Sequence, residues 1–353
     1  MIPDPFPRLD RLEQLVLGWT GGEPPAAIHE MPGGASTRRY YRVEVAPGRS
    51  AVAMFVPDAA VSDEIVKGGA PSHRWPFLEV RELLLEHGVR VPQLLAEACQ
   101  DGFILIEDLG DDTLANYLLR RPEQREILYR GAVADLAAAQ RRLQHLPPES
   151  VIKARAFDHD LLRWEIDHFR EWGLEARGIE LSSDDRRLFD GAAEYLASTI
   201  ASWPRGFVHR DYQSRNLMVR IDATGQLHLV WIDFQDALLG PRVYDLVALL
   251  NDSYQTFDRA FIERRLDEYA AALGVGAEER HAIGVEFDLV TVQRKLKDAG
   301  RFVFIDRKKH NPNFLQFVEP TIEKARAAID RLTETPEVRA LAGVLDRALG
   351  PRT

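Results

Sequence analysis

The sequence predicts an α+β fold with two lobes, a small N-terminal lobe with an antiparallel sheet plus a helix and a larger, mainly helical C-terminal lobe. The pattern of apolar residues changes once along the 353 residues. Short strand-like runs mixed with helices extend to about residue 106, and helical spacing dominates from about residue 112, apart from one hairpin. We therefore expect lobes over 1–106 and 112–353, joined by a hinge over 107–111.

The N-terminal lobe should begin with the sheet. Apolar, β-branched and aromatic residues favour strands over 26–31, 39–45 and 50–56, and turns rich in proline and glycine separate these runs. A helix is expected over 75–87, where apolar residues recur at helical spacing before a glycine. An apolar strand over 103–106 then leads into the expected hinge.

The C-terminal lobe contains a motif held between predicted strands. His209-Arg210-Asp211 is followed by Asn216, and a later apolar run ends at Asp233-Phe234. A turn between two of the strands predicts a hairpin with Asn216 at its entry and Asp233 at its exit. The strands expected to hold this loop rigidly cover 206–208, 217–221 and 227–232.

This motif matches the catalytic loop and metal-binding signature of protein kinases. Asp211 would orient a hydroxyl and accept its proton, and Asn216 and Asp233 would bind Mg²⁺ together with ATP phosphates. The motif thus predicts a protein-kinase-like two-lobed fold that uses ATP and Mg²⁺. The alternative is a coincidental loop, with Asp211 in a turn and His209 as a core histidine. The agreement of several residues with their strand context favours the catalytic interpretation.

The segment after Asp233 distinguishes small-molecule kinases from protein kinases. Gln235 replaces the glycine of the D-F-G motif, only a few residues precede Gly240-Pro241, and no A-P-E follows. Protein kinases form their peptide platform from a long segment between D-F-G and A-P-E. We therefore expect a small hydroxylated acceptor, enclosed by the helices after residue 252.

Several residues near the motif have expected supporting roles. Backbone groups of Glu107 and Leu109 should contact adenine, on their order in the chain alone. Arg215 either offsets phosphate charge or stabilises the catalytic loop. Asp245 should hydrogen-bond the backbone of that loop, because buried charges persist only when paired, and His209 should likewise be structural.

A glycine-rich turn offers a possible phosphate contact. In Gly33-Gly34-Ala35-Ser36, the glycines would let backbone amides approach an anion, so Gly33, Gly34 and Ser36 are candidates for nucleotide binding. A Gly-Gly pair is equally typical of a plain hairpin turn.

Taken in order, these motifs resemble the aminoglycoside phosphotransferase and choline kinase superfamily, in its bacterial branch, over nearly the whole chain. The resemblance includes Gly240-Pro241-Arg242-Val243-Tyr244-Asp245-Leu246 after the metal-binding strand. More narrowly, three stretches are similar to kinases of the anomeric hydroxyl of N-acetylmuramate and N-acetylglucosamine in cell-wall recycling. These stretches are Gly34-Ala35-Ser36-Thr37-Arg38-Arg39-Tyr40, Ile106-Glu107-Asp108-Leu109-Gly110 and Gln293-Arg294-Lys295-Leu296-Lys297. The resemblance implies an amino-sugar acceptor, with an aminoglycoside, choline or another sugar as the alternative.

One position departs from the kinase pattern. A kinase usually has a lysine on its third strand to pair with the α/β-phosphates, and Met54 is the expected occupant here. The helix glutamate that normally pairs with that lysine, Glu79 or Glu82, would then be surface charge. Strand alternation puts Arg38 and Arg42 on one face and Arg39 on the other. The candidates to replace the lysine are Arg38, Arg39, Arg42 and Lys67, and the resemblance favours Arg39.

The missing lysine also raises a second class of function. A nucleotide-binding pseudokinase could keep the fold without the chemistry. However, Asp211, Asn216 and Asp233 are all present, and catalytic groups retained together favour an enzyme.

The charge of one segment indicates the chemical class of the acceptor. The segment over 293–310 contains seven basic residues against two aspartates. A cationic acceptor would call for carboxylates or aromatic rings instead, so a neutral or anionic acceptor, such as a sugar with a carboxylate, fits better. Arg294 and Lys297 share a helix face and can reach one ligand, whereas Lys308 and Lys309 are expected to face solvent. Asp252 and Tyr254 are expected to bind acceptor hydroxyls, unless Asp252 caps the next helix.

The composition is that of an ordinary globular protein, with 45% hydrophobic and 28% charged residues. A net charge of −10 argues against a nucleic-acid partner. The single cysteine, Cys99, excludes an intrachain disulfide. The sequence shows no secretory signal and no apolar stretch of membrane-spanning length, so we expect a cytoplasmic protein without a membrane partner.

Overall fold

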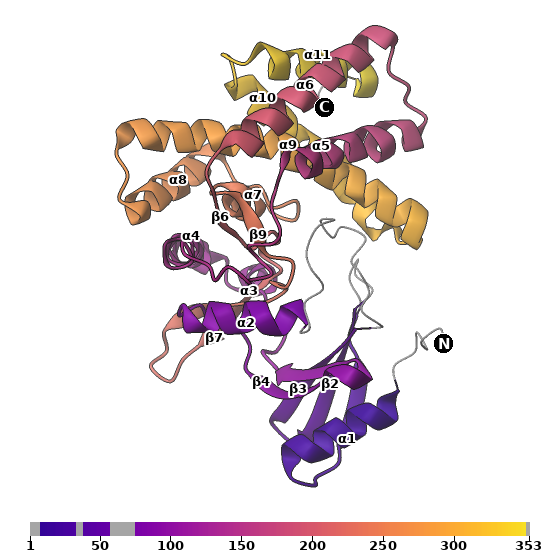
Figure 1. Ribbon diagram of the computed structural model, residues 1–353, viewed down its shortest axis with the longest axis vertical. Coiled ribbons are helices and arrows are strands. Elements are labelled where there is room, and N and C mark those ends of the chain that lie inside the picture. The colour runs from indigo at the N-terminus through magenta and orange to yellow at the C-terminus, as the bar shows by residue number, and fades with distance from the viewer. Residues whose placement is uncertain (1–7, 33–37, 57–74, 351–353) are drawn as a thin grey trace.

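The computed structural model describes residues 8–32, 38–56 and 75–350. A five-stranded antiparallel sheet lies at one end of the molecule, and most helices gather at the other end (Figure 1). The expected α+β fold is therefore confirmed.

The N-terminal part combines the sheet with two helices among its described residues. The strand order is β1-β2-β3-β5-β4. The predicted strands and helix begin and end within one residue of those observed, whereas no bounds were predicted for α1 or β4. The elements are α1 (Leu9–Thr20), β1 (Ala27–Glu30), β2 (Arg39–Ala46), β3 (Arg49–Phe55), α2 (Pro76–Glu86), β4 (Leu94–Ala98) and β5 (Phe103–Glu107).

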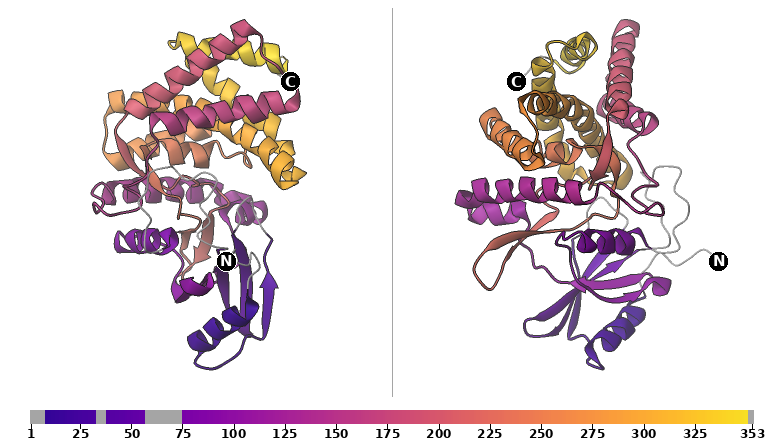
Figure 2. Two further views of the ribbon diagram at one scale, coloured as in Figure 1. Left: turned by 45° about the vertical axis from the view of Figure 1, so that its right-hand side comes forward. Right: turned by 60° about the vertical axis from the view of Figure 1, so that its left-hand side comes forward.

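The two faces of this sheet pack against different elements. Residues directly opposite each other on neighbouring strands, such as Tyr40 and Met54, share a face. The face with Tyr41 packs on α1 through Leu12, and α1 lies on the outer side of the sheet (Figure 2). The other face, with Met54, packs on α2 at Phe77 and is turned toward the helical part.

The rest of the chain is mainly helical. β7 and β8 form the predicted hairpin, and β6 pairs with β9. The elements are α3 (Leu114–Arg120), α4 (Arg125–Arg142), α5 (His159–His168), α6 (Ser183–Ser202), β6 (Arg205–Val208), β7 (Leu217–Ile221), β8 (Leu227–Trp231), β9 (Leu238–Pro241), α7 (Tyr244–Leu250), α8 (Arg259–Leu273), α9 (Ala277–Lys309), α10 (Val318–Arg331) and α11 (Pro336–Leu349).

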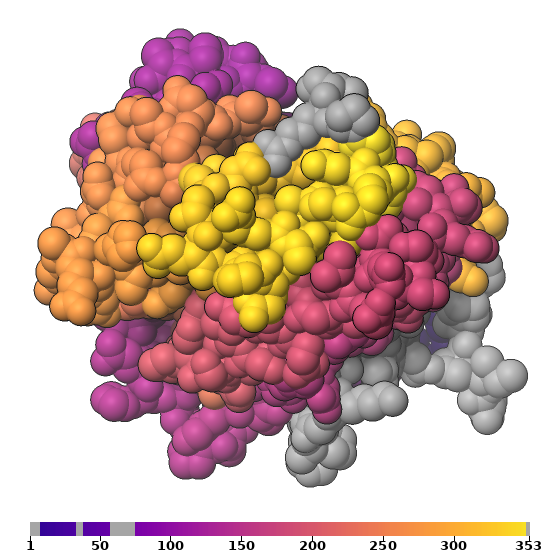
Figure 3. Space-filling view, turned by 90° about the horizontal axis from the view of Figure 1, so that it is seen from above, coloured from indigo at the N-terminus to yellow at the C-terminus, as the bar shows by residue number. Residues whose placement is uncertain are grey.

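Helix α9, 33 residues long, organises the helical part. It packs against α10, α5 and a π-helix over Phe169–Leu174. Gly300 allows a close approach, because a Cβ there would lie 2.8 Å from the His168 carbonyl oxygen and 2.9 Å from the Phe169 Cα. Farther out, α11 packs against α6, and the C-terminal segment lies across this end of the molecule (Figure 3).

The segment that connects the sheet to the helices is short. β5 ends at Glu107 and α3 begins at Leu114. The division into lobes over 1–106 and 112–353 with a hinge over 107–111 stays a prediction. Every helix within the described ranges is too short or too polar to cross a lipid bilayer.

Candidate active site

The loop between β6 and β7 carries Asp211 and Asn216. The Asn216 Nδ2 donates to the Asp211 carbonyl oxygen at 2.9 Å, and the Asp211 backbone N–H donates to His209 Nδ1 at 3.3 Å. These two bonds brace the loop from within. Because the amide nitrogen of Asn216 is used in the loop, its amide oxygen is the end available to a ligand.

Asp245, in the first turn of α7, holds the same loop from behind. Its Oδ2 accepts from the His209 N–H at 2.7 Å and its Oδ1 accepts from the Arg210 N–H at 3.0 Å. Arg210 has a φ of 79°, an uncommon conformation outside glycine that these bonds support. Burial raises the pKa of Asp245 to about 7, against the opposing effect of the two N–H donors. The contact is the one expected from the position of Asp245 in the sequence.

His209 lies beneath the loop and is fully buried. Its ring packs edge-on against Tyr212 and Trp231, with centroids 5.7 Å away in both cases. Burial lowers the pKa of His209 to about 4. The imidazole is therefore neutral at pH 7 and acts as a structural support.

Asp252 also supports the loop, contrary to the expectation that it binds the acceptor. It is 1% exposed, and its Oδ2 accepts from the backbone N–H of Ser214 at 3.0 Å and from the hydroxyl of the same residue. Its Oδ1 accepts from the Tyr254 N–H. Nor does Asp252 cap the next helix, because Asp258 caps α8 through the Phe261 N–H.

Asp233 follows β8 in a left-handed conformation, with a φ of 62°. Its Oδ1 accepts from Gln235 Nε2 at 2.8 Å and from Arg38 at 3.4 Å. Burial and the negative charge of Asp211 raise the pKa of Asp233, and Arg38 opposes this rise. A cation bound here would thus favour the ionised form of the carboxyl group.

The donors at Asn216 and Asp233 fit a magnesium ion. The protein bonds above engage Asn216 Nδ2 and Asp233 Oδ1. The amide oxygen of Asn216 and the second carboxylate oxygen of Asp233 therefore remain available to a metal ion. Both are hard oxygen donors of the type that Mg²⁺ prefers. Over the described ranges, no group of three or more His, Cys, Asp or Glu side chains is arranged for a metal. The other ligands would accordingly be waters and phosphates.

A cavity of about 860 Å³ lies between the sheet and the helical part. It brings together the three residues predicted for catalysis and metal binding, two predicted adenine contacts and three of the four predicted acceptor contacts. The lining residues relevant here are Arg38, Tyr40, Val52, Ile106, Glu107, Leu109, Asp211, Asn216, Asp233, Tyr254, Arg294, Lys297 and Arg301.

At the hinge end, the cavity has an apolar floor. Leu109 packs with Met218, Val230 and Ile232. Among the backbone hydrogen bonds of the described residues, the Leu109 N–H takes part in none, whereas the Glu107 N–H donates to the Gln93 carbonyl oxygen at 2.9 Å. The predicted phosphate contacts Gly33, Gly34 and Ser36, like Lys67, lie outside the described residues.

The structure does not bring Arg39 into the cavity. Arg39 Nε and one of its terminal nitrogens donate to the Glu30 carboxylate at 2.8 and 2.7 Å. Arg38, on the opposite face, reaches the cavity and bonds Asp233 and Asp236. Arg42 pairs with Asp108 in the predicted hinge.

At the end predicted to bind the acceptor, cations of α9 lie next to the loop that carries Asp211. Arg294 is 3% exposed, donates to the Arg210 carbonyl oxygen at 2.9 Å and has a nitrogen 3.7 Å from Asp211 Oδ1. Lys297 Nζ lies 3.1 Å from Asp298 Oδ1. Although burial opposes it, the nearby cations Lys295, Lys297 and Arg294 hold the pKa of Asp298 well below its usual range.

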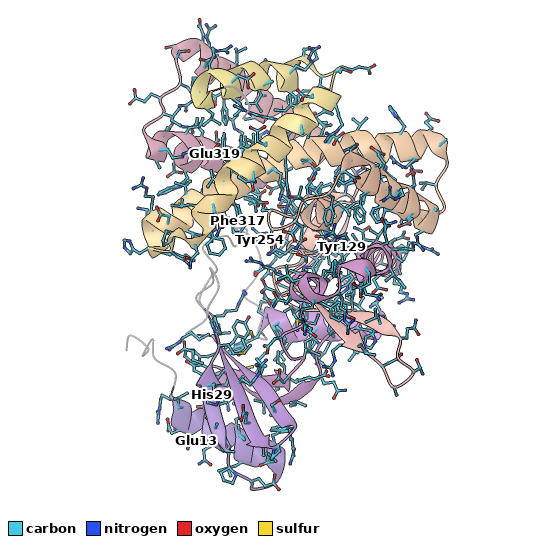
Figure 4. The ribbon with its side chains drawn as sticks, turned by 180° about the vertical axis from the view of Figure 1, so that it is seen from behind. Glu13, His29, Tyr129, Tyr254, Phe317 and Glu319 are labelled. Carbon is cyan, nitrogen blue, oxygen red and sulfur yellow. The ribbon has the colours of Figure 1, made fainter. Side chains whose placement is uncertain are left out.

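Tyr254 and Arg215 meet at the edge of the cavity. The Arg215 guanidinium lies 3.5 Å from the centroid of the Tyr254 ring, and Tyr254 packs edge-on against Phe317 at 4.9 Å (Figure 4). Burial raises the pKa of Tyr254 to about 12, so its hydroxyl remains a donor at neutral pH. On α9, Lys309 lines the cavity, whereas Lys308 is exposed and lies over Trp172.

Sequence reasoning missed two acidic residues of the cavity. Asp236 follows Asp233 by three residues and accepts from Arg38 at 3.0 Å. Asp298 follows Arg294 by four residues, a spacing that places both side chains on one helix face. The short spacing of each acid from a predicted site residue is the sequence signal that could have placed it in the site.

The fold, the braced loop and the paired metal donors define a small-molecule phosphotransferase with a kinase-like architecture. The chain belongs to the Phosphotransferase enzyme family, whose model matches residues 27–282. This confirms the family resemblance predicted from the motifs.

Curated relatives match most of the chain. The N-acetylmuramate/N-acetylglucosamine kinase of Pseudomonas aeruginosa is 32% identical over 333 residues, which cover 93% of this chain and 91% of the relative. The protein of the same name from Pseudomonas putida is 31% identical over 343 residues, covering 95% and 94%.

Solved structures share the fold. The gentamicin–APH(2'')-IIa complex superimposes with a TM-score of 0.59 at 13% identity, covering 93% of this chain and 97% of that chain. A Plasmodium vivax ethanolamine kinase gives a TM-score of 0.57 at 12% identity, covering 90% and 86%. At such identities the similarity is one of fold.

Proposed function

We propose that this protein is an ATP-dependent sugar kinase that phosphorylates the anomeric hydroxyl of N-acetylmuramate or N-acetylglucosamine. The proposal rests on one observation, the cavity in which Asp211, Asn216 and Asp233 lie between the hinge and the cationic face of α9. The names of the curated relatives, which are similar over more than nine-tenths of the chain, support the acceptor class. Cell-wall recycling in the cytoplasm, where ATP is available, is the corresponding setting.

Asp211 is the proposed general base. Its carboxylate lines the cavity, where it orients the acceptor hydroxyl and takes its proton, a role that contributes about 10²- to 10⁴-fold to the rate. Arg294, with a nitrogen 3.7 Å from Asp211 Oδ1, holds that carboxylate in position. Mg²⁺ held by Asn216 and Asp233 would neutralise charge on the transferred phosphoryl group.

Adenine binding is assigned to the hinge over 107–111, between the N-terminal lobe over 1–106 and the C-terminal lobe over 112–353. The Glu107 carbonyl oxygen and the Leu109 N–H are the proposed polar contacts. The apolar floor formed by Leu109, Met218 and Ile232 offers a surface for the adenine ring.

The acceptor is assigned to the wall formed by α9. Lys297 and Arg301 favour a neutral or anionic sugar over a cationic one. The stacked rings of Phe302 and Phe314, with centroids 5.8 Å apart, add apolar surface for a sugar ring. Tyr254 supplies a hydroxyl, so the wall combines hydrogen bonding, positive charge and apolar contact.

An ADP-release screen with Mg²⁺ and ATP tests the proposal. The acceptors are N-acetylmuramate, N-acetylglucosamine, other hexoses, choline and aminoglycosides, and Asp211→Asn is the control enzyme. We expect turnover with the two N-acetylated sugars, and ³¹P NMR of the product should show an anomeric phosphate.

Two outcomes would contradict the proposal. Turnover with cationic acceptors alone would overturn the assignment of the α9 wall. Stabilisation by nucleotide without turnover of any acceptor would favour a pseudokinase.

A further inference from the structure

The sheet face that lines the cavity lacks the usual cation on its third strand. Met54 occupies that position, is 1% exposed and belongs to the same core as Phe77 of α2. A methionine side chain cannot neutralise a phosphate. A nucleotide polyanion would therefore need its positive charge from a different position.

Arg38 occupies a suitable position, directly before the neighbouring strand β2. Tyr40 pairs directly with Met54, and Arg38 lies two residues before Tyr40, so the alternation of β2 places it on the face of Met54. Arg38 and Tyr40 both line the cavity. Among the cavity-lining residues in the sheet or next to its strands, within the described ranges, Arg38 is the basic one.

The contacts of Arg38 place its guanidinium at the metal-binding end of the cavity. One terminal nitrogen donates to Asp233 Oδ1 at 3.4 Å and the other donates to Asp236 Oδ2 at 3.0 Å. The side chain is 16% exposed, which shows that it is held inside the site. Burial acts to lower the pKa of Arg38, but the charges of Asp236 and Asp233 raise it overall, so the group stays positive.

Four other arginines near the sheet or the catalytic loop have different partners. Arg39 pairs with Glu30 on the opposite face, and Arg42 pairs with Asp108 at the hinge. On the acceptor side, Arg294 lies beside Asp211, and Arg215 lies over Tyr254.

We propose that Arg38 binds the α/β-phosphates of the nucleotide and so replaces the lysine that β3 lacks. A guanidinium has five N–H donors in a planar fork, which suits it to join carboxylates and a phosphate in one arrangement. The inference rests on the proposed nucleotide binding and is independent of the acceptor.

Binding of ADP and of adenosine to the full-length protein, measured by calorimetry in EDTA, tests this role without turnover or metal. Arg38→Met should weaken ADP binding by about 10- to 100-fold, the loss expected for a hydrogen bond between charged groups. Adenosine has no phosphate, so its affinity should not change, which also shows that the variant is folded. Arg39→Met is the matched control and should bind both ligands like the wild type.

A double variant separates a phosphate contact from simple neutralisation of Asp236. Arg38→Met combined with Asp236→Asn removes one positive and one negative charge, so the net charge of the site is that of the wild type. ADP binding should stay weak in this double variant if Arg38 contacts phosphate. Recovery of ADP binding there would overturn the proposal, because Arg38 would then act only by offsetting the acid.

Three further binding results would each support or overturn a specific part of the proposal. Arg38→Lys should fall between the wild type and Arg38→Met, since an ammonium keeps the charge but loses the planar fork. ADP binding by Arg38→Met that equals the wild type would overturn the Arg38 assignment alone. A wild-type protein that binds neither ADP nor adenosine would instead overturn the proposed function itself.

Discussion

The Glu79 carboxylate accepts a hydrogen bond from the backbone N–H of Val151, with Oε1 2.5 Å from the nitrogen. Glu79 lies in the first turn of α2, and Val151 lies between α4 and α5. The bond therefore ties the helix of the sheet region to the helical part of the molecule. The prediction that the helix glutamate is only a surface charge is therefore wrong for Glu79.

Removal of this carboxylate should cost stability. Glu79→Ala leaves the Val151 N–H without its acceptor, so we expect the free energy of unfolding to fall by about 1–3 kcal/mol. Glu79→Gln keeps an oxygen acceptor and should lose less. Urea unfolding measures both, with Glu86→Ala, at an exposed site of the same helix, as the control. Equal losses in Glu79→Ala and Glu86→Ala would contradict the role of the bond.

Asp211 should control turnover without controlling nucleotide binding. Asp211→Asn removes the proposed base, and we expect kcat to fall by about 10²- to 10⁴-fold. ADP affinity should stay near that of the wild type, because Asp211 is not one of the proposed nucleotide contacts. Steady-state kinetics with N-acetylglucosamine and calorimetry with ADP provide the two readouts. A variant that keeps its kcat would show that another group takes the proton.

Lys297 should favour an acceptor that carries a carboxylate. Lys297→Met is expected to raise KM for N-acetylmuramate about tenfold more than KM for N-acetylglucosamine, since a charge-assisted hydrogen bond is lost only with the acid. Lys308→Met is the matched control, because Lys308 is exposed and lies over Trp172. An equal rise for both sugars would mean that Lys297 acts only through its ion pair with Asp298.

His209 and Asp245 should have opposite effects on the pH dependence of stability. Folding lowers the pKa of His209 from 6.5 to about 4, so its contribution to stability falls as the pH drops through this range. Folding raises the pKa of Asp245 from 3.8 to about 7, so its contribution is present at low pH and is lost as the pH rises toward 7. In the wild type the two contributions largely cancel between about pH 4 and 6.5.

Single variants should reveal each contribution. Relative to the wild type, His209→Gln should gain stability on acidification from about pH 6.5 to 4.5, and Asp245→Asn should lose it, each by about 1.4 kcal/mol per pH unit. Urea unfolding at several pH values provides the measurement. Differences from the wild type that do not change with pH would show that neither pKa is shifted by folding.

Local patterns were sufficient for most of the N-terminal sheet, for α2 and for the β7–β8 hairpin. The runs that became β2, β3 and the β7–β8 hairpin are rich in strand-forming residues between clear turns, so their ends could be read closely. No bounds were predicted for α1 and β4. α1 begins after Arg8 without a side-chain cap, although Leu12 and Val16 have helical spacing. β4 has the sequence Leu-Leu-Ala-Glu-Ala, whose residues prefer helices. Pairing with β5 makes β4 a strand, and that tertiary contact is invisible in the local sequence.

The candidate site likewise contains residues that the sequence could predict and residues that it could not. Asp211, Asn216 and Asp233 share a motif with fixed spacing, so they could be named together. The alternation of β2 placed Arg38 and Arg39 on opposite faces but could not say which face the cavity occupies. Asp252 illustrates the other limit, because an acid beside a helix end can bind a ligand or be buried, and only the position of Ser214 decides.

The close approach at Gly300 has a consequence for how the proposed acceptor site can change in evolution. Backbone of the π-helix region lies where a side chain at position 300 would be, so α9 is fixed in depth against the outer helices. The neighbouring residue Arg301, like Lys297 one turn earlier, lines the cavity. Acceptor preference can therefore diverge through single substitutions on one helix face, while the helix that presents them keeps its place in every descendant that retains the glycine.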